Sequence, residues 1–176
     1  AMQTKEEDHV ASMFVTLSHD YVMFITNHGR LHWLKGYRIP EGSRQSKGKP
    51  IVNLLSDLEE GEKVVNTICA SGFPEDRYLV FCTREGLIKK TSLAAYGNVR
   101  ARGIKAIKLD EGDELIETDI TSGDEQIIIA SADGQAVRFD ESDVRAMGRD
   151  TMGVKGMTLN DGDRVVSMAG VTAGDR

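Results

Sequence analysis

Three loops in this chain carry residue types that bind phosphate groups. They read GSRQSKG at residues 42–48, GNVRARG at 97–103 and GRDTMG at 148–153. Arg and Lys side chains donate charged hydrogen bonds to phosphate oxygens, and the backbone N–H groups of a glycine-bounded loop add further donors. The pattern indicates binding to a phosphate backbone, which requires no contact with the bases. A single basic loop is more commonly a solvated surface, so the interpretation depends on the recurrence.

The net charge of −6 hides a strong segregation of charge along the sequence. The span 30–49 carries a net charge of +5 and the span 84–108 carries +6, whereas 110–125 carries −8. In the third copy, residues 138–155, the basic and acidic residues cancel. Because the same loop is basic in two clear copies and diluted in the third, the pattern favours a DNA-binding surface and predicts a weaker contribution from the third copy.

We predict that the DNA contacts come from these loops and from the strands that flank them. Lys90 and Arg138 each lie four residues after a predicted turn glycine, and we expect both to point outward toward the same edge. An ordinary solvated face fits this pattern equally well. The acidic turns at 59–62 and 110–114 are expected to lie off the DNA path. The predicted DNA-binding residues are Arg30, Lys35, Arg44, Lys47, Lys49, Lys89, Lys90, Arg100, Arg102, Lys105, Arg138, Arg145, Arg149 and Lys155.

The sequence offers little support for other chemistry. No Ser/His/Asp arrangement, phosphate loop, paired general-acid carboxylates or metal cluster stands out, so we predict no catalytic, cofactor-binding or metal-ligating residues. His28 and His32 lie four residues apart across a predicted hairpin turn and lack a third ligand. Cys69 and Cys82 lie in apolar runs, which predicts buried thiols and no disulfide. Trp33 is expected to pack in the core or at a blade edge.

The elements that position the loops follow from an internal repeat of about 50 residues. Gly61, Gly112 and Gly162 lie in the acidic turns EEGEKVV, DEGDELI and NDGDRVV, and glycines 29, 86 and 134 lie in three predicted hairpin turns. Short β-rich runs separated by such turns are typical of hairpins. Four short strands per unit predict an all-β fold of propeller-type blades. Single helical turns are expected only near 92–96 and 141–147.

The expected organisation is a leader over residues 1–9 followed by one domain over residues 10–176. Three blades are predicted at about 10–55, 64–109 and 115–159, and residues 160–176 begin a further blade. Closed propellers have about four to eight blades, so three blades form part of a disc or complete one by pairing. Unpaired strands near Val10–Leu17 and Arg164–Val171 would favour edge-to-edge association of two copies.

The composition excludes a disordered tail and a membrane protein. Apolar residues make up 40% of the chain and charged residues 28%, as in globular proteins. No apolar run approaches the roughly 20 residues of a transmembrane helix, and AMQTKEEDHV lacks the pattern of a secretion signal. We therefore expect no membrane partner and a cytoplasmic location.

The basic segments and their surroundings resemble the C-terminal domain of the bacterial DNA gyrase A subunit. The likeness covers essentially the whole chain, and KGKPIVNLL and VRAMGRDTMGVKG are more similar to gyrase than to topoisomerase IV. The resemblance implies a β-pinwheel whose blades exchange strands and whose basic perimeter wraps double-stranded DNA for negative supercoiling. It also implies that the partners are the rest of the gyrase A polypeptide and the gyrase B polypeptide, in an A2B2 heterotetramer. ATP and Mg would act elsewhere in that bacterial, nucleoid-associated holoenzyme.

Two features depart from the family pattern. The Gln-Arg-Arg-Gly-Gly-Lys-Gly type box that normally precedes a segment resembling TKEEDHV is absent, and the family disc has about six blades where three are predicted here. No tyrosine lies in a context resembling the active site of the parent enzyme, so we expect no DNA cleavage by this chain. The alternatives are a protein-interaction propeller and the equivalent domain of topoisomerase IV. The recurring basic loop favours DNA binding over the protein-interaction propeller.

Overall fold

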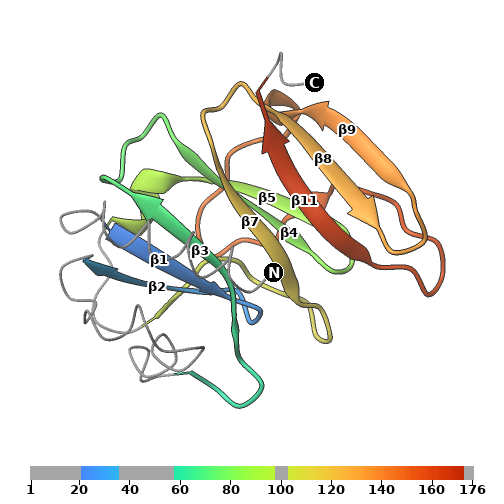
Figure 1. The fold of residues 1–176 in the computed structure, drawn as a ribbon, viewed down its shortest axis with the longest axis horizontal. Helices are drawn as coiled ribbons and strands as arrows, with labels where there is room; N and C mark the ends of the chain where they lie inside the picture. The colour runs from blue at the N-terminus through green and yellow to red at the C-terminus, as the bar shows by residue number, and fades with distance from the viewer. Residues whose placement is uncertain (1–20, 36–57, 98–102, 173–176) are drawn as a thin grey trace, which may run out of the picture.

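Three antiparallel sheets lie side by side in the computed structural model, which describes residues 21–35, 58–97 and 103–172 (Figure 1). Each sheet is built around a hairpin whose turn contains a glycine with positive φ, a conformation that glycine adopts without the steric cost of a Cβ. The three predicted hairpins are therefore confirmed. They are β1 (Tyr21–Thr26) with β2 (Arg30–Lys35), β4 (Tyr78–Thr83) with β5 (Leu87–Ser92), and β8 (Gln126–Ser131) with β9 (Ala136–Asp140).

Each hairpin is completed by strands that come later in the chain. The first sheet has the order β3-β1-β2-β6, the second β10-β5-β4-β7 and the third β11-β8-β9. Each sheet thus takes strands from two consecutive repeats, which is the strand exchange that the family resemblance implies. The added strands are β3 (Val64–Ala70), β6 (Ile104–Lys105), β7 (Leu115–Thr121), β10 (Val154–Lys155) and β11 (Val165–Val171).

In the third sheet, β9 is the edge strand at the position where the first two sheets add β6 or β10, and the described residues provide no fourth strand there. The prediction that Arg164–Val171 is unpaired is wrong, because β11 pairs along its length with β8. Spacing alone did not reveal that the last strand completes the preceding hairpin. The predicted partner edge at residues 10–17 lies outside the described residues.

Strand β4 is buried on both faces, which explains its unbroken apolar sequence. Leu79 and Phe81 pack in a core shared with the first sheet, whereas Val80 and Cys82 pack in a core shared with the third. Successive residues of a strand point to opposite faces, so β4 contributes to both cores. Cys82 is buried, as predicted, whereas Cys69 is only half-buried; neither forms a disulfide with a described residue.

The fold is all-β, as predicted. Among the described residues, helical turns occur only at η3 (Leu93–Tyr96) and η4 (Glu141–Asp143). The half-buried Trp33 packs with its ring 4.9 Å from the Tyr21 ring and 6.0 Å from the Phe73 ring, which confirms its predicted packing role. Within the described part of the chain, no helix has the length and apolar character needed to span a membrane.

Candidate nucleic-acid interface

The short strands β6 and β10 lie at the outer edges of the first two sheets. Here we call residues 103–109 and 148–159, which contain them, the rim segments. Lys105 pairs with Arg30, and Lys155 occupies the equivalent position opposite Leu87. Both lysines are exposed, and neither forms an ion pair with another described residue. Two ammonium groups are therefore presented at repeated positions on the outermost strands.

Glycines at the start of the rim strands allow these strands to approach the hairpins closely. A Cβ at Gly153 would collide with the Ile88 backbone, and a Cβ at Gly103 would collide with the His32 ring. Each glycine is therefore required by packing. This role differs from the exposure of backbone N–H groups expected for a glycine-bounded loop.

The third repeat contributes three more of the predicted basic residues. Arg138 on β9 and Arg145 are exposed, and Arg149 is half-buried. None of the three forms an ion pair with another described residue, although Arg138 donates a hydrogen bond to Gln126 on β8. The expected outward orientation of Arg138 is confirmed.

Lys89 and Lys90 are buried, so the prediction that Lys90 points outward is wrong. Ile88 and Lys90 lie two residues apart on β5 and share the face that packs against the third sheet. The Lys90 ammonium donates to the Glu141 carbonyl oxygen at 3.1 Å and lies 3.9 Å from its carboxylate. The Lys89 ammonium donates to two backbone carbonyls. Neither ammonium is exposed for a phosphate contact.

Arg30 is also engaged by acidic groups. Its Nη1 lies 2.9 Å from Oε1 of the buried Glu62 and 3.8 Å from Oε1 of Glu59, so a phosphate would compete with two carboxylates. The side chain of Lys35, at the end of β2, is outside the described residues. So are the predicted contacts Arg44, Lys47, Lys49, Arg100 and Arg102.

The acidic turns have a structural role that the sequence reasoning missed. In each repeat, an acid directly follows a turn glycine with positive φ and binds the hairpin turn of the preceding repeat. Asp113 Oδ1 accepts from the Glu85 N–H at 3.1 Å, and Asp163 Oδ1 accepts from the Asp133 N–H at 3.0 Å. The sequence does contain a signal for this contact. An acid directly follows each glycine of the acidic turns, and a hydroxyl residue lies three positions before each hairpin glycine. The acids are Glu62, Asp113 and Asp163, and the hydroxyl residues are Thr26, Thr83 and Ser131.

The Glu62 carboxylate is held in its ionised form by its neighbours. Burial favours a raised pKa, whereas the hydrogen bonds from the Thr26 hydroxyl and the Glu59 N–H favour a lowered one. The positive charge of Arg30 and an electrostatic contribution from His28 act in the same direction, so the pKa of Glu62 is lowered. The carboxylate therefore holds the first hairpin turn as an anion at neutral pH.

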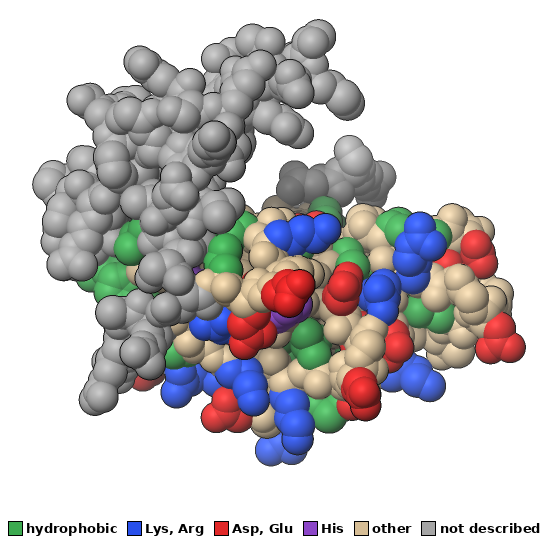
Figure 2. All heavy atoms as spheres, turned by 90° about the horizontal axis from the view of Figure 1, so that it is seen from below, with side chains coloured by type: hydrophobic (Ala, Val, Ile, Leu, Met, Phe, Trp, Pro, Cys, Tyr) green, Lys and Arg blue, Asp and Glu red, His purple; other side chains and the backbone are tan. Residues whose placement is uncertain are grey.

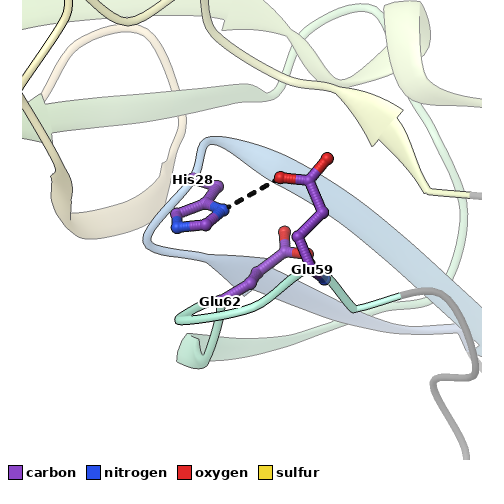
Figure 3. A group of neighbouring side chains, drawn as sticks. All are labelled: His28, Glu59 and Glu62. Atoms are coloured by element: carbon purple, nitrogen blue, oxygen red, sulfur yellow. Dashed lines mark hydrogen bonds and ion pairs between the residues drawn. The ribbon is translucent and has the colours of Figure 1, made fainter.

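His28, Glu59 and Glu62 gather beside this turn in an arrangement that a metal ion could use (Figure 3). His28 Nδ1 lies 3.2 Å from Glu59 Oε2. Both carboxylate oxygens of Glu62 are already bound, Oε2 by the Thr26 hydroxyl at 2.5 Å and Oε1 by Arg30. The adjacent guanidinium repels a cation. We therefore interpret the group as an ion-pair cluster that fixes the turn.

Charges of both signs lie side by side on one face of the described part. Figure 2 shows Lys and Arg side chains interleaved with Asp and Glu over one face, with small apolar areas between them. Among the described residues, the exposed large hydrophobic side chains are Val154 and Val166. Contacts made by this face would therefore be mainly electrostatic.

Comparison with known families agrees with the repeated geometry. The family model described as the DNA gyrase C-terminal domain, beta-propeller, matches residues 20–71, 77–122 and 125–172. The chain belongs to the DNA gyrase C-terminal domain family. Each matched block contains one hairpin and ends at β3, β7 or β11, the strand that pairs with the first strand of that hairpin.

Curated relatives are named as the A subunit of DNA gyrase. The protein from Clostridium acetobutylicum is 48% identical over 156 residues, which cover 89% of this chain and 19% of that protein. The Escherichia coli protein is 42% identical over 168 residues, which cover 96% of this chain and 19% of that protein. This chain therefore spans about a fifth of the length of these relatives.

Solved structures show the same architecture. The C-terminal domain of DNA topoisomerase IV matches with a TM-score of 0.81 and 30% identity, covering 90% of this chain and 49% of that one. The DNA gyrase A C-terminal domain matches with a TM-score of 0.70 and 29% identity, covering 87% of this chain and 48% of that one. The pinwheel architecture implied by the sequence resemblance is confirmed.

Proposed function

We propose that this chain is a non-catalytic module of a type II DNA topoisomerase that binds double-stranded DNA independently of sequence. The observation that carries the proposal is the exposure of Lys105 and Lys155 at equivalent positions on the outermost strands. Membership of the gyrase C-terminal domain family supports it. Exposed basic groups repeated along an edge fit the regular phosphates of a duplex, and no base contact is needed.

The mechanism of binding is neutralisation of phosphates with release of counterions. Lys105 and Lys155 act on the two rim strands, and Arg138, Arg145 and Arg149 add contacts in the third repeat. The third repeat contributes less because its acidic residues cancel the basic ones between residues 138 and 155. Lys89 and Lys90 are excluded from the contact set because they are buried.

The decisive test is the salt dependence of binding to a duplex of about 40 base pairs, measured with two unrelated sequences. The double variant Lys105→Gln/Lys155→Gln should weaken binding equally for both and reduce the salt slope by about 0.9 per phosphate neutralisation removed. A matched control is Lys63→Gln/Arg164→Gln, which removes two exposed charges from equivalent positions in the acidic turns. Equal losses in both double variants, or an unchanged slope in the rim variant, would contradict the assignment.

The basic loops outside the described residues belong to the same proposal. Neutralising Arg100, Arg102 and Lys105 together should reduce the salt slope by about 0.9 for each phosphate that is no longer neutralised. We also propose that Arg44, Lys47 and Lys49 act in the first repeat. An unchanged affinity and slope in the Arg100, Arg102 and Lys105 triple variant would contradict this part of the rim.

Within the parent enzyme, we propose that this module guides negative supercoiling by an ATP-dependent A2B2 assembly of gyrase polypeptides. The module itself holds no cofactor and does not cleave DNA, and the assembly acts on the bacterial nucleoid in the cytoplasm. In a gyrase holoenzyme carrying this domain, Lys105→Gln/Lys155→Gln should reduce supercoiling and leave relaxation and DNA cleavage active. Equal loss of all three activities would contradict a guiding role.

The open edge of β9 supports a second proposal, edge-to-edge association. β2 and β5 each carry a short strand on their far side, whereas β9 pairs only with β8 among the described strands. A hollow of about 560 Å³ lies beside it, lined by residues 135–137 and 155–158. We propose that a strand of a second copy pairs with this edge in the isolated chain. A clean monomer at high micromolar concentration in sedimentation equilibrium would exclude it.

A further inference from the structure

Lys89 joins parts of the chain that are far apart in sequence. The residue lies on β5 with its side chain fully buried. Its Nζ donates to the carbonyl oxygen of Ala106 at 2.7 Å and to that of Arg149 at 2.5 Å. A single ammonium group therefore binds the two rim segments at the same time.

The two carbonyls belong to rim segments of consecutive repeats, next to the proposed DNA contacts. Ala106 directly follows Lys105, and Arg149 lies in the loop that leads into β10. Lys108 lies two residues after Ala106, and Thr151 lies two residues after Arg149. The Lys108 N–H donates to the Thr151 carbonyl oxygen at 3.1 Å. The rim segments therefore touch along a short backbone seam, and Lys89 lies beneath it.

A second buried donor supports the same seam. The Tyr96 hydroxyl donates to the Ala106 carbonyl oxygen at 3.1 Å, so this oxygen accepts hydrogen bonds from Tyr96 and Lys89 together. Both side chains are fully buried beneath β6. The hydrogen bonds from the Lys89 ammonium and the Tyr96 hydroxyl to the Ala106 carbonyl thus fix the backbone next to Lys105.

A lysine is a costly way to fill this space. Burial lowers the pKa of Lys89 to about 8, the nearby Asp150 opposes this shift and Arg149 adds to it. A methionine would occupy a similar volume without removing a charge from water. What the ammonium provides beyond packing is directional hydrogen bonding to two separate loops.

We propose that Lys89 is a positioning residue that locks the rim segments of two consecutive repeats together, so that Lys105, Arg149 and Lys155 meet one DNA duplex as a single surface. The inference rests on the proposed DNA-binding function. It assigns Lys89 no contact with DNA. Its role is to set the relative position of charges contributed by different repeats.

The first test needs no DNA. In Lys89→Met, hydrogen exchange at the Lys108 amide should accelerate by about tenfold or more, because the seam opens locally. The Ala106 and Ile107 amides, which donate to the Gly29 carbonyl in the first sheet, serve as internal references and should change much less. Unchanged exchange at Lys108 would overturn the proposal whatever the DNA result.

The second test is the salt slope of duplex binding, measured where each variant is fully folded. Lys89→Met should bind about tenfold more weakly at 100 mM salt, with a slope reduced by about 1 to 2, since fewer phosphates are contacted together. The control is Met168→Ala, a core truncation on β11 that lowers stability away from the rim. A variant that only populates more unfolded chain keeps the wild-type slope, so equal slopes in Lys89→Met and wild type would overturn the proposal.

A milder variant keeps the proposal testable if Lys89→Met does not fold. Tyr96→Phe removes the other donor to the Ala106 carbonyl and should change exchange and slope in the same direction by a smaller amount. No change in either quantity would overturn the proposal. If the wild-type chain binds no DNA while Lys108 exchange responds to Lys89→Met, the proposed function fails and the structural seam remains.

Discussion

Strands β5 and β9 occupy the same place in consecutive repeats, yet one is enclosed and the other is open. On β5, Lys89 and Lys90 are buried, and the two residues of β10 pair with the start of the strand, at Leu87 and Ile88. On β9, Arg138 is exposed, and the described residues place no strand beyond it. The exposure of a given repeat position is therefore decided by the neighbouring repeat and not by the residue type.

The hairpin glycines show the same difference. Gly86 lies against the segment that follows β10, so that a Cβ there would meet the Met157 carbonyl oxygen at 2.8 Å. A Cβ at the equivalent Gly134 would meet nothing within 4 Å among the described residues, although its φ of 90° is almost the same as the 93° of Gly86. In the open hairpin, Gly134 is required only by its positive φ. In the enclosed hairpin, Gly86 is required both by its positive φ and by the close approach of the Met157 carbonyl.

The largest loss of stability is expected in Gly86→Ala, with Gly134→Ala as its comparison. The open site should lose about 1 to 2 kcal/mol of unfolding free energy, the cost of a left-handed conformation for alanine. The enclosed site should lose about 1 to 3 kcal/mol more, because the methyl group collides with the Met157 carbonyl. Urea denaturation at neutral pH measures both. Equal losses would mean that the Met157 carbonyl of the next repeat does not restrict the residue at position 86.

The second comparison sets Lys90→Met against Arg138→Met. Removing Lys90 leaves the buried Glu141 without its cation, which should cost about 3 kcal/mol of stability. Removing the exposed Arg138 should change stability by less than about 0.5 kcal/mol. Adding Glu141→Gln to Lys90→Met should recover part of the loss. A Lys90→Met variant as stable as Arg138→Met would show that Lys90 is not part of the core.

The sequence predicted the hairpins and the repeat well because both depend on local chemistry. Each turn needs a glycine with positive φ, and the flanking residues have strong strand propensity. The burial of Lys90 was missed although the period of a strand places it on the same face as Ile88, a core residue. The sign of its charge suggested exposure, whereas the buried Glu141 that compensates it lies 51 residues away.

The close contacts between repeats could not be predicted from the residues alone. Nothing in the spacing of Lys89 indicates that its ammonium reaches carbonyls at positions 106 and 149. Backbone acceptors have no sequence signature, since every residue carries one. The strand exchange that creates these contacts came from the family resemblance. The exposed positions of Lys105 and Lys155 were predictable because they recur after equivalent glycines.

The third prediction concerns Cys82, which lies on β4, the strand that is buried on both faces. Burial raises the pKa of this thiol to about 12, and the charges of Asp113 and Glu117 act in the same direction. The unfolded thiol ionises from about pH 9 while the folded thiol does not, so the folded state loses stability as pH rises through this range.

At pH 10.5 the wild type should therefore have lost about 2 kcal/mol more than Cys82→Ala, each relative to its own value at pH 8. Comparing the two pH profiles removes the contributions of Lys89 and the tyrosines, which both proteins share. Ala130 occupies the equivalent position on β8, so the third repeat has no thiol to add to the effect. Parallel profiles would show that Cys82 is accessible to water.

The smallest expected effect concerns a hydrogen bond that occurs in both hairpins and should contribute about equally to the stability of each. The Thr83 hydroxyl accepts from the Leu87 N–H at 3.1 Å, and the Ser131 hydroxyl accepts from the Gln135 N–H at 3.2 Å. Both bonds lie within their own hairpin, and the Ser131 hydroxyl also interacts with the carboxylate of Asp163 in the following acidic turn. Thr83→Val and Ser131→Ala should each cost about 1 kcal/mol, the net value of one hydrogen bond, and agree within about 0.5 kcal/mol.

This near equality is informative because every other paired substitution is expected to differ strongly. If Thr83→Val proved much more damaging than Ser131→Ala, the enclosed hairpin would be more sensitive to any change, and the contrasts at Gly86 and Lys90 would reflect that general sensitivity. If the two costs agree, the enclosed and open hairpins have the same intrinsic stability. The differences at Gly86 and Lys90 then measure the contacts made by the following repeat, the same contacts through which Lys89 reaches the rim.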